Sequence, residues 1–572
     1  MVRIRTGAMI AVAAIVFSAC QGAAATPSPS NPASQPPASS GASASASAPA
    51  AGAPKNGGIL VVGLPGDMVL ADPTLVSDSN SSYIMENVIE GLVGLKPGTT
   101  SDVVPVLAEA MPTESTDGKT YTFKVRQGVK FHDGTMLDAT AVKYSYDRQL
   151  NAPAALRDAY NYYFGAVFGW ADKSNLASVA TPDAATVVFT LKQPQSNFLL
   201  SQTLPQFGIQ SPTALKAGDA DNPDPSKSKY AQGQGTGMVG TGPFKFAEWV
   251  PNDHVAIVKN PDYWNPDGMA HLDKIVYKPY ADQTAELNAL QAGDIDFAQT
   301  IAPNDVKTIK ADPKLQVIDR GESCNIALLQ MNQTHPPFNN KDIRTAIAYA
   351  LNKQSYIDAF YGGLAVPADN WMPLNTQYAK PLGLPTYDAT KAKEFIAKSG
   401  LSGDQLKLTF YYPSDVARPY MPDPKGLAQA IATDLEAVGF KITFKTEGWR
   451  TGYLADEAVG KFPMWLLGWT CDWAGPDNFL VTAFFHFDGG KPNAEFAYGP
   501  AALKAAFDAG LSATDSASAQ AAWGTAQDIL AADLPTVPLV NSKPPAAAKA
   551  DVKGFVGAGN LEELFNGVWL DR

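Results

Sequence analysis

A strand, helix and strand pattern in the second half of the chain constrains the fold most. Residues 406–410 and 441–444 have the composition of strands. Between them, residues 426–438 repeat leucine, isoleucine and valine at three- and four-residue spacing, which predicts an amphipathic helix that ends at Gly439. Two strands joined through a helix run parallel in one sheet, so this part of the chain is predicted to be α/β.

Other segments extend the α/β pattern along the chain. The predicted strands include residues 58–64, 121–125 and 186–191, and the predicted helices include residues 83–92, 341–352 and the segment after Asp138. Asp138 and Asn340 stand where helix caps are expected. The body is therefore expected to be an α/β protein of several lobes.

Composition and charge limit the partners. Of 572 residues, 45% are hydrophobic and 17% are charged, as in soluble globular proteins. Without the first 55 residues, enough chain remains for three or four folding units of roughly 150 residues. The formal net charge of −12 disfavours nucleic acid and anionic lipid surfaces as partners.

The first twenty residues have the pattern of an export signal. Arg3 and Arg5 precede an apolar run over residues 8–17, which is too short to span a bilayer as a stable helix. Residues 16–20, Val-Phe-Ser-Ala-Cys, resemble the lipobox of bacterial lipoproteins. The resemblance implies lipidation of Cys20 and an extracytoplasmic, membrane-anchored or periplasmic location. The alternative is a plain secretory signal cleaved at Ala19 or in the alanine-rich stretch that follows.

Residues 21–55 are almost entirely alanine, serine, proline and glycine, with no aromatic residue to form a core. This composition predicts a disordered linker. A chain of this length has a root-mean-square span of about 30 Å, enough to hold a globular body away from a membrane.

The chain has three cysteines, of which Cys20 is assigned to the anchor. Cys324 and Cys471 could pair in an oxidising compartment. Two isolated cysteines without CxxC spacing give little support for pairing, so the interpretation favoured here is that both are ordinary buried thiols.

Motifs of catalysis and cofactor binding are absent or out of context. Residues 235–240 have the letters of a dinucleotide-binding motif but lack the preceding strand and the following helix, and residues 226–229 spell S-x-x-K inside a surface loop. The five histidines show no metal-ligand spacing. No enzyme activity, cofactor or metal is expected, although a pair of carboxylates for glycoside hydrolysis stays open, because spatial pairing is invisible in sequence.

The segment with the least ordinary composition is residues 464–480, where a buried strand leads into a loop. In this loop Trp469 and Trp473 flank Asp472. The rings could wall a pocket and the carboxylate could bind a ligand cation. The alternative is a core strand end with a solvated turn, which composition alone favours.

Several stretches resemble the extracytoplasmic solute-binding proteins of family 5, the receptors for oligopeptides, dipeptides and nickel that serve ATP-binding-cassette importers. The matching pieces occur in family order at residues 125–135, 240–246, 260–264, 293–297, 342–351 and 468–480. The resemblance covers about residues 57 to 556 of the chain.

The resemblance implies an α/β fold of two lobes, with an extra subdomain on the N-terminal lobe. The expected divisions are a signal peptide at 1–20, a linker at 21–55, an N-terminal lobe at 56–325, a second lobe at 326–515 and a C-terminal return at 516–572. The strands that cross between the lobes are expected near residues 323–331 and 510–530.

In peptide-binding members, the aspartate after the Gly-Trp pair holds the α-ammonium group of the ligand, and Asp472 matches this position. Trp469 matches a cleft tryptophan, whereas Trp473 stands where many members have tyrosine. The expected function is the capture of peptides, or of similar zwitterionic or cationic solutes, by a monomer that delivers them to a membrane permease. The alternatives are a member specific for oligosaccharides or another solute, and a secreted hydrolase.

Overall fold

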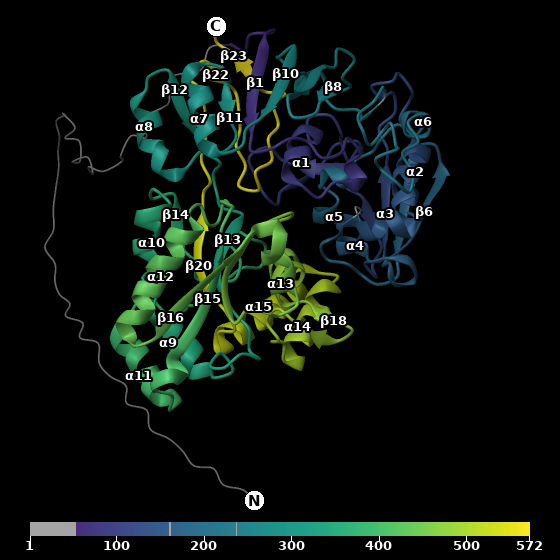
Figure 1. The fold of residues 1–572 in the computed structure, drawn as a ribbon. Helices are drawn as coiled ribbons and strands as arrows, with labels where there is room; N and C mark the ends of the chain where they lie inside the picture. The colour runs from purple at the N-terminus through teal and green to yellow at the C-terminus, as the bar shows by residue number, and fades with distance from the viewer. Residues whose placement is uncertain (1–52, 160–161, 236) are drawn as a thin grey trace, which may run out of the picture. The chain divides into compact units, whose positions relative to one another are not determined.

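The structure is a computed structural model that describes residues 53–159, 162–235 and 237–572 (Figure 1). The predicted signal segment, with Cys20, and nearly all of the predicted linker lie outside the described residues. Within the described part, three larger sheets of seven, six and four strands carry the fold. No helix in this part is long and apolar enough to cross a membrane.

The seven-stranded sheet is built mainly from the first half of the chain. Its order is β12 (Leu315–Ile318), β21 (Ala546–Lys549), β11 (Phe297–Ala298), β1 (Ile59–Leu64), β10 (Lys274–Pro279), β9 (His254–Lys259) and β8 (Phe244–Val250). β1 confirms the strand predicted at 58–64 and pairs in parallel with β10 and β11. Helices α7 (Gln283–Ala292) and α8 (Val306–Ala311) lie beside this sheet (Figure 1).

A four-stranded antiparallel sheet has its own hydrophobic core. Its order is β4 (Thr113–Glu114), β5 (Thr120–Lys124), β7 (Thr186–Leu191) and β6 (Leu176–Asp183), which confirms the strands predicted at 121–125 and 186–191. Helix α2 (Ala139–Leu150) packs on it and begins at Asp138, whose side chain accepts a hydrogen bond from the Ala141 amide, as predicted. The same core includes α4 (Tyr162–Phe168) and α5 (Phe198–Ser201).

The six-stranded sheet belongs to the second half of the chain. Its order is β14 (Ala365–Pro367), β20 (Val537–Ser542), β13 (Asn325–Met331), β17 (Met464–Thr470), β15 (Lys407–Pro413) and β16 (Lys441–Glu447). Around it are the helices α9 (Lys341–Ala350), α10 (Lys353–Phe360), α11 (Ala389–Ser399), α12 (Pro424–Val438), α13 (Leu454–Ala458), α14 (Ala501–Leu511) and α15 (Ser516–Asp533) (Figure 1). Helix α9 confirms the helix predicted after Asn340, whose side chain caps it.

The predicted parallel unit is confirmed by β15, α12 and β16. The two strands pair in parallel from Lys407 opposite Lys441 to Pro413 opposite Glu447. Helix α12 ends at Gly439, where φ is 116°, a backbone conformation that glycine adopts without the steric cost of a Cβ atom.

The helix predicted at 83–92 is wrong in its bounds, because α1 covers Ser79–Met85 and starts at an Asp78 cap. The backbone carbonyls of Asn87 and Val88 accept hydrogen bonds from the amides of Phe244 and Gly242, 3.2 and 3.1 Å away. The Asn87 side chain also donates to the Glu563 carbonyl in the C-terminal tail, 2.8 Å away. Long-range bonding of the backbone carbonyls therefore replaces the next helical turn.

The chain passes between the seven- and six-stranded sheets at residues 319–324 and 543–545. The first passage overlaps the expected region, whereas the expectation at 510–530 is wrong, because these residues lie largely in α14 and α15. That stretch is rich in alanine, the strongest helix former. Strand β20 follows in the six-stranded sheet, so the return to the seven-stranded sheet begins after Ser542, later than residue 516.

Candidate ligand-binding site

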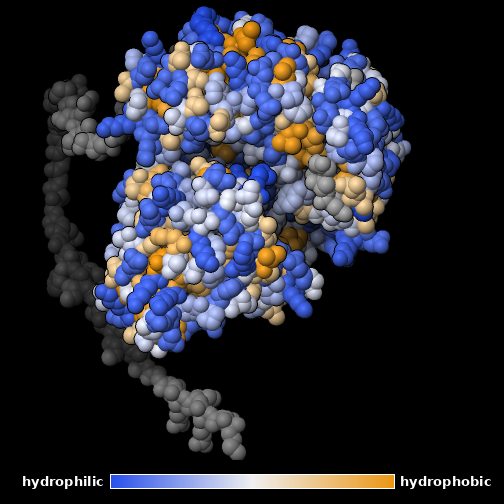
Figure 2. All heavy atoms as spheres, in the orientation of Figure 1, coloured by the Kyte–Doolittle hydropathy of each residue, from blue (hydrophilic) through white to orange (hydrophobic). Residues whose placement is uncertain are grey.

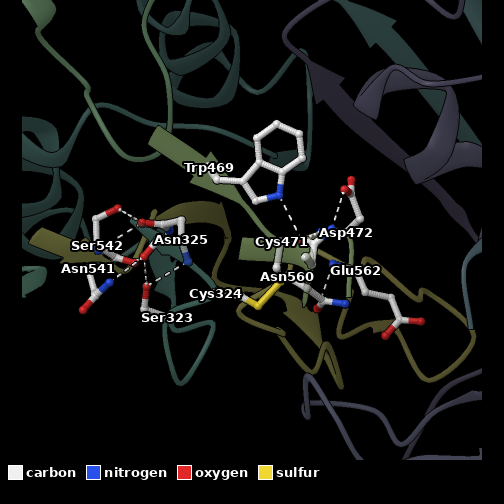
Figure 3. The surroundings of a disulfide bond; sticks show 11 residues. Ser323, Cys324, Asn325, Trp469, Cys471, Asp472, Asn541, Ser542, Asn560 and Glu562 are labelled. Carbon is white, nitrogen blue, oxygen red and sulfur yellow. Dashed lines mark hydrogen bonds between the residues drawn. A yellow bond between two sulfur atoms is a disulfide. The ribbon is translucent and has the colours of Figure 1, made fainter. Parts of the chain in front are cut away.

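A disulfide bond lies where two central strands of the six-stranded sheet leave it. Cys324 directly precedes β13 and Cys471 directly follows β17, and these strands pair with Asn325 opposite Thr470. The cysteine Cα atoms are 5.5 Å apart, and the two residues are bonded (Figure 3). The interpretation of two free buried thiols is therefore wrong, since the strand register that brings them together cannot be read from their spacing.

Asp472 follows Cys471 and holds a half-buried carboxylate between two parts of the chain. Its Oδ1 accepts a hydrogen bond of 2.9 Å from the hydroxyl of Tyr163 in α4, and its Oδ2 accepts one of 3.0 Å from Asn478 Nδ2. No lysine, arginine or histidine among the described residues forms an ion pair with it. Burial raises the pKa of Asp472 to about 6 although both hydrogen bonds oppose the shift.

Asn478 organises the loop that contains this aspartate. Its Oδ1 accepts hydrogen bonds from the indole nitrogen of Trp469, at 2.9 Å, and from the backbone amide of Asp472, at 3.1 Å. Its Nδ2 donates to the Asp472 carboxylate. Asn478 thus joins two of the three predicted ligand residues, Asp472 and Trp469, in one network.

Trp473 lies in a different environment from the other two predicted residues. Its side chain is 1% exposed and packs in the core of the four-stranded sheet, although its own segment follows β17. Its indole nitrogen donates to Asp477 Oδ2, 2.9 Å away, and Asn197 beside α5 donates to the same oxygen. Trp473 thus connects the segment after β17 of the six-stranded sheet to the core of the four-stranded sheet. Its predicted contact with a ligand stays a prediction.

A cavity of about 120 Å³ lies at the Asp472 carboxylate. Its walls come from α1, from Tyr163, from residues 203–206, from the end of β17 and from residues 560–562 of the C-terminal tail. Seventeen residues line it, including four acids and no lysine, arginine or histidine. Neither Trp469 nor Trp473 is among them. The acidic lining therefore suits a cationic ligand.

A wider hollow of about 690 Å³ lies elsewhere, between residues 336–340 and 401–407. Its charged lining residues, Asp404 and Lys407, are exposed and pair with each other. It lacks a half-buried carboxylate without an ion-pair partner, such as Asp472 in the smaller cavity, so the smaller cavity is the better candidate for a ligand site. On the molecular surface, Figure 2 shows a furrow between the upper and the lower part of the described body.

Sequence reasoning proposed Asp472 and Trp469 but not Tyr163, Asn478 or the tail residues that the structure places beside Asp472. Tyr163 is separated from Asp472 by 309 positions, and no local pattern connects them. Asn478 lies within the unusual 464–480 segment, next to an aspartate, and this position could have suggested a polar residue of the site. No pattern in the sequence pointed to residues 560–562.

Comparisons with known proteins agree with this architecture. The family model described as bacterial extracellular solute-binding proteins, family 5 middle, matches residues 102–491, more than half of the chain. The chain is 31% identical over 411 residues to di/tripeptide-binding protein 1 of Pseudomonas aeruginosa, covering 70% of this chain and 73% of that one. It is 29% identical over 506 residues to the glutathione-binding protein GsiB of Shigella flexneri, with 87% and 91% covered.

Solved structures are similar over nearly the whole described body. The periplasmic binding protein DppA of Helicobacter pylori, in complex with the peptide STSA, matches with a TM-score of 0.73 and 28% identity, covering 91% of this chain and 99% of that one. HbpA2 of Haemophilus parasuis matches with a TM-score of 0.76 and 26% identity, covering 90% and 100%. The predicted two-lobed α/β class is confirmed, and the chain belongs to family 5 of the bacterial extracellular solute-binding proteins.

Proposed function

We propose that this protein is the substrate-binding component of an ATP-binding-cassette importer and captures peptides or similar small zwitterionic or cationic solutes. The di/tripeptide-binding and glutathione-binding relatives, and the peptide complex of DppA, support this substrate class. The protein makes and breaks no bond. It binds as a monomer and delivers its ligand to a membrane permease.

The observation that carries the proposal is the unpaired carboxylate of Asp472 in the cavity. A carboxylate has about four lone-pair sites, and Tyr163 and Asn478 use two of them. The remaining sites can accept hydrogen bonds from the α-ammonium group of a peptide. A buried cation needs such a partner, because an unpaired charge in a closed cavity is costly.

Lobe closure is the proposed means of capture. Across the two halves, Tyr163 bonds to Asp472, and Ser196 bonds through its amide and hydroxyl to the carbonyls of Leu511 and Gly510, each 2.8 Å away. A ligand that contacts both halves makes all of its contacts only when the two halves are closed together. It therefore favours the closed state by its differential affinity for the two states.

The two predicted tryptophans act on this site in different ways in the proposal. Trp469 positions Asn478, which in turn orients the Asp472 carboxylate. Trp473 couples the Asp472 loop to the core of the four-stranded sheet, so that the cavity closes when that core is docked. Neither role requires direct contact with the ligand.

Lipid anchoring at Cys20 completes the proposal. The lipobox-like residues 16–20 and the low-complexity residues 21–55 support a receptor held at the outer face of the cytoplasmic membrane by a slack tether. Tethering raises the concentration of the receptor at its permease. Labelling with radioactive palmitate tests this: wild type is expected to be labelled and Cys20→Ala is not, and equal labelling of both would refute the anchor.

A calorimetric screen of di- to pentapeptides against purified protein tests the substrate class. Binding of at least one peptide group is expected, with the peptide recovered unchanged by mass spectrometry. Binding of an oligosaccharide, with no binding of any peptide, would refute the peptide assignment. Cleavage products would refute the role of a pure receptor.

A further inference from the structure

The cavity at Asp472 contains more negative charge than a single α-ammonium group requires. Its four acidic lining residues are Asp78, Glu86, Asp472 and Glu562. Asp78 is occupied as the cap of α1, since both of its oxygens accept hydrogen bonds of 2.9 Å from Ser81. The carboxylates of Glu86 and Glu562 do not cap a helix, so their presence in the cavity needs another explanation.

Glu86 and Glu562 come from opposite ends of the chain. Glu86 follows the last turn of α1, and only its Oε2 is engaged, by the backbone amide of Glu563, 3.1 Å away. The Glu562 carboxylate forms no hydrogen bond or ion pair with any described residue. Figure 3 shows Glu562 on the same side of the disulfide as Asp472.

The guanidinium of Arg320 is already engaged by other groups. Arg320 and Glu563, both 1% exposed, form a buried ion pair, and Arg320 also donates to the carbonyls of Gln299 and Pro544. Burial and the charge of Glu562 hold the pKa of Glu86 well above its usual range, and burial raises the pKa of Glu562 to about 7. Glu86 bonds to the residue next to Glu562 and both acids line one cavity, with no cationic side chain among the cavity residues.

A second observation in the same cavity points to a ligand with N–H donors. Gln206 lines the cavity and is 2% exposed, yet its Oε1 has no hydrogen-bond partner among the described residues. Its Nε2 faces the Val76 carbonyl and the Ser82 hydroxyl, at 3.4 and 3.2 Å, and the need of that carbonyl for a donor fixes the amide orientation. A buried acceptor without a donor is costly, and a ligand ammonium or guanidinium group would satisfy it.

We propose that Glu86 and Glu562 form a second cation subsite, which binds the basic side chain of a peptide whose α-ammonium group is held by Asp472. This inference rests on the proposed function and narrows the substrate class to peptides with arginine or lysine as the first residue. A metal ion is the less suitable occupant, because no three histidine, cysteine, aspartate or glutamate side chains of the described residues are placed so that they could hold one ion.

Titration calorimetry with two peptides of equal shape tests the subsite. Arg-Ala-Ala and citrulline-Ala-Ala differ in the charge of the first side chain, so wild type is expected to bind the arginine peptide about tenfold more tightly or better. Glu562→Gln is expected to remove most of this preference while retaining affinity for the citrulline peptide. Glu436→Gln, at an exposed position of α12, is the matched control and should retain the full preference.

Glu86→Gln provides an independent variant, and thermal melting verifies that each variant is folded. Equal wild-type affinity for both peptides would overturn the subsite and leave the proposed function intact. A preference that survives both Glu562→Gln and Glu86→Gln would overturn the assignment to these residues. Failure of wild type to bind either peptide, or any other peptide in the screen, would overturn the proposed function and the subsite together.

Discussion

The hydroxyl of Tyr163 donates a hydrogen bond of 2.9 Å to Oδ1 of Asp472, a residue 309 positions later in the chain. Tyr163 belongs to α4, beside the four-stranded sheet, and Asp472 belongs to the loop after β17 of the six-stranded sheet. One hydrogen bond therefore links the two halves at the carboxylate proposed to bind the ligand. Closure of the body and the charge state of the site are coupled at this point.

Replacing Tyr163 should raise the pKa of Asp472 and weaken peptide binding. Tyr163→Phe removes a hydrogen bond that lowers the pKa of Asp472, so this pKa should rise further and peptide affinity at pH 7 should fall, at a cost of about 1 kcal/mol. Calorimetry at several pH values measures the change. Tyr162→Phe is the control, because Tyr162 is exposed and its hydroxyl makes no hydrogen bond among the described residues. Equal effects of the two substitutions would contradict the assigned role of Tyr163.

The pH dependence of stability has a defined sign at Asp472. The folded protein holds the proton of this carboxyl more tightly than the unfolded chain, because its pKa is about 6 instead of 3.8. Ionisation therefore destabilises the ligand-free protein as pH rises through this window, and the full cost is present at pH 7. Asp472→Asn should melt at a higher temperature relative to wild type at pH 7.5 than at pH 4.

The control for this comparison is Asp262→Asn, a substitution at an exposed position. Its melting temperature relative to wild type should stay the same at both pH values. Other buried acids, such as Asp477, are present in wild type and in both variants, so their contributions cancel in the differences. A difference for Asp472→Asn that does not depend on pH would contradict the raised pKa.

Reduction of the disulfide between Cys324 and Cys471 should destabilise the body and loosen the site. The bond closes a loop of 147 residues, and loss of such a bond costs about 2–5 kcal/mol. Thermal melting with and without dithiothreitol measures this cost, and peptide affinity should fall as well, since Asp472 directly follows Cys471. A Cys324→Ala, Cys471→Ala variant should not respond to dithiothreitol. Two titratable thiols in untreated, denatured protein would show that the bond is absent.

Local patterns predicted the regular elements well where side-chain spacing and caps agree. The parallel unit of β15, α12 and β16 followed from hydrophobic spacing and a glycine stop, and α2 and α9 followed from their caps. The helix predicted at 83–92 ends early because the carbonyls of Asn87 and Val88 bond to the distant amides of Phe244 and Gly242. Helix propensity depends on residues near in the sequence, so it cannot predict such a long-range contact.

The candidate site was predictable only in the part that lies on one segment. Asp472 and Trp469 could be proposed because their loop has an unusual composition and resembles a family motif. The partners Tyr163, Glu86 and Glu562 come from other elements, and the pairing of Cys324 with Cys471 depends on the register of β13 and β17. These relationships arise only when the sheets are assembled.

The most direct test of the account is the binding of one peptide in two forms, with a free and with an acetylated amino terminus, to wild type and to Asp472→Asn. Calorimetry should show that wild type binds the free form more tightly. The substitution should weaken binding of the free form by about tenfold or more and change binding of the acetylated form little. An equal loss for both forms would contradict the assignment of Asp472 to the α-ammonium group.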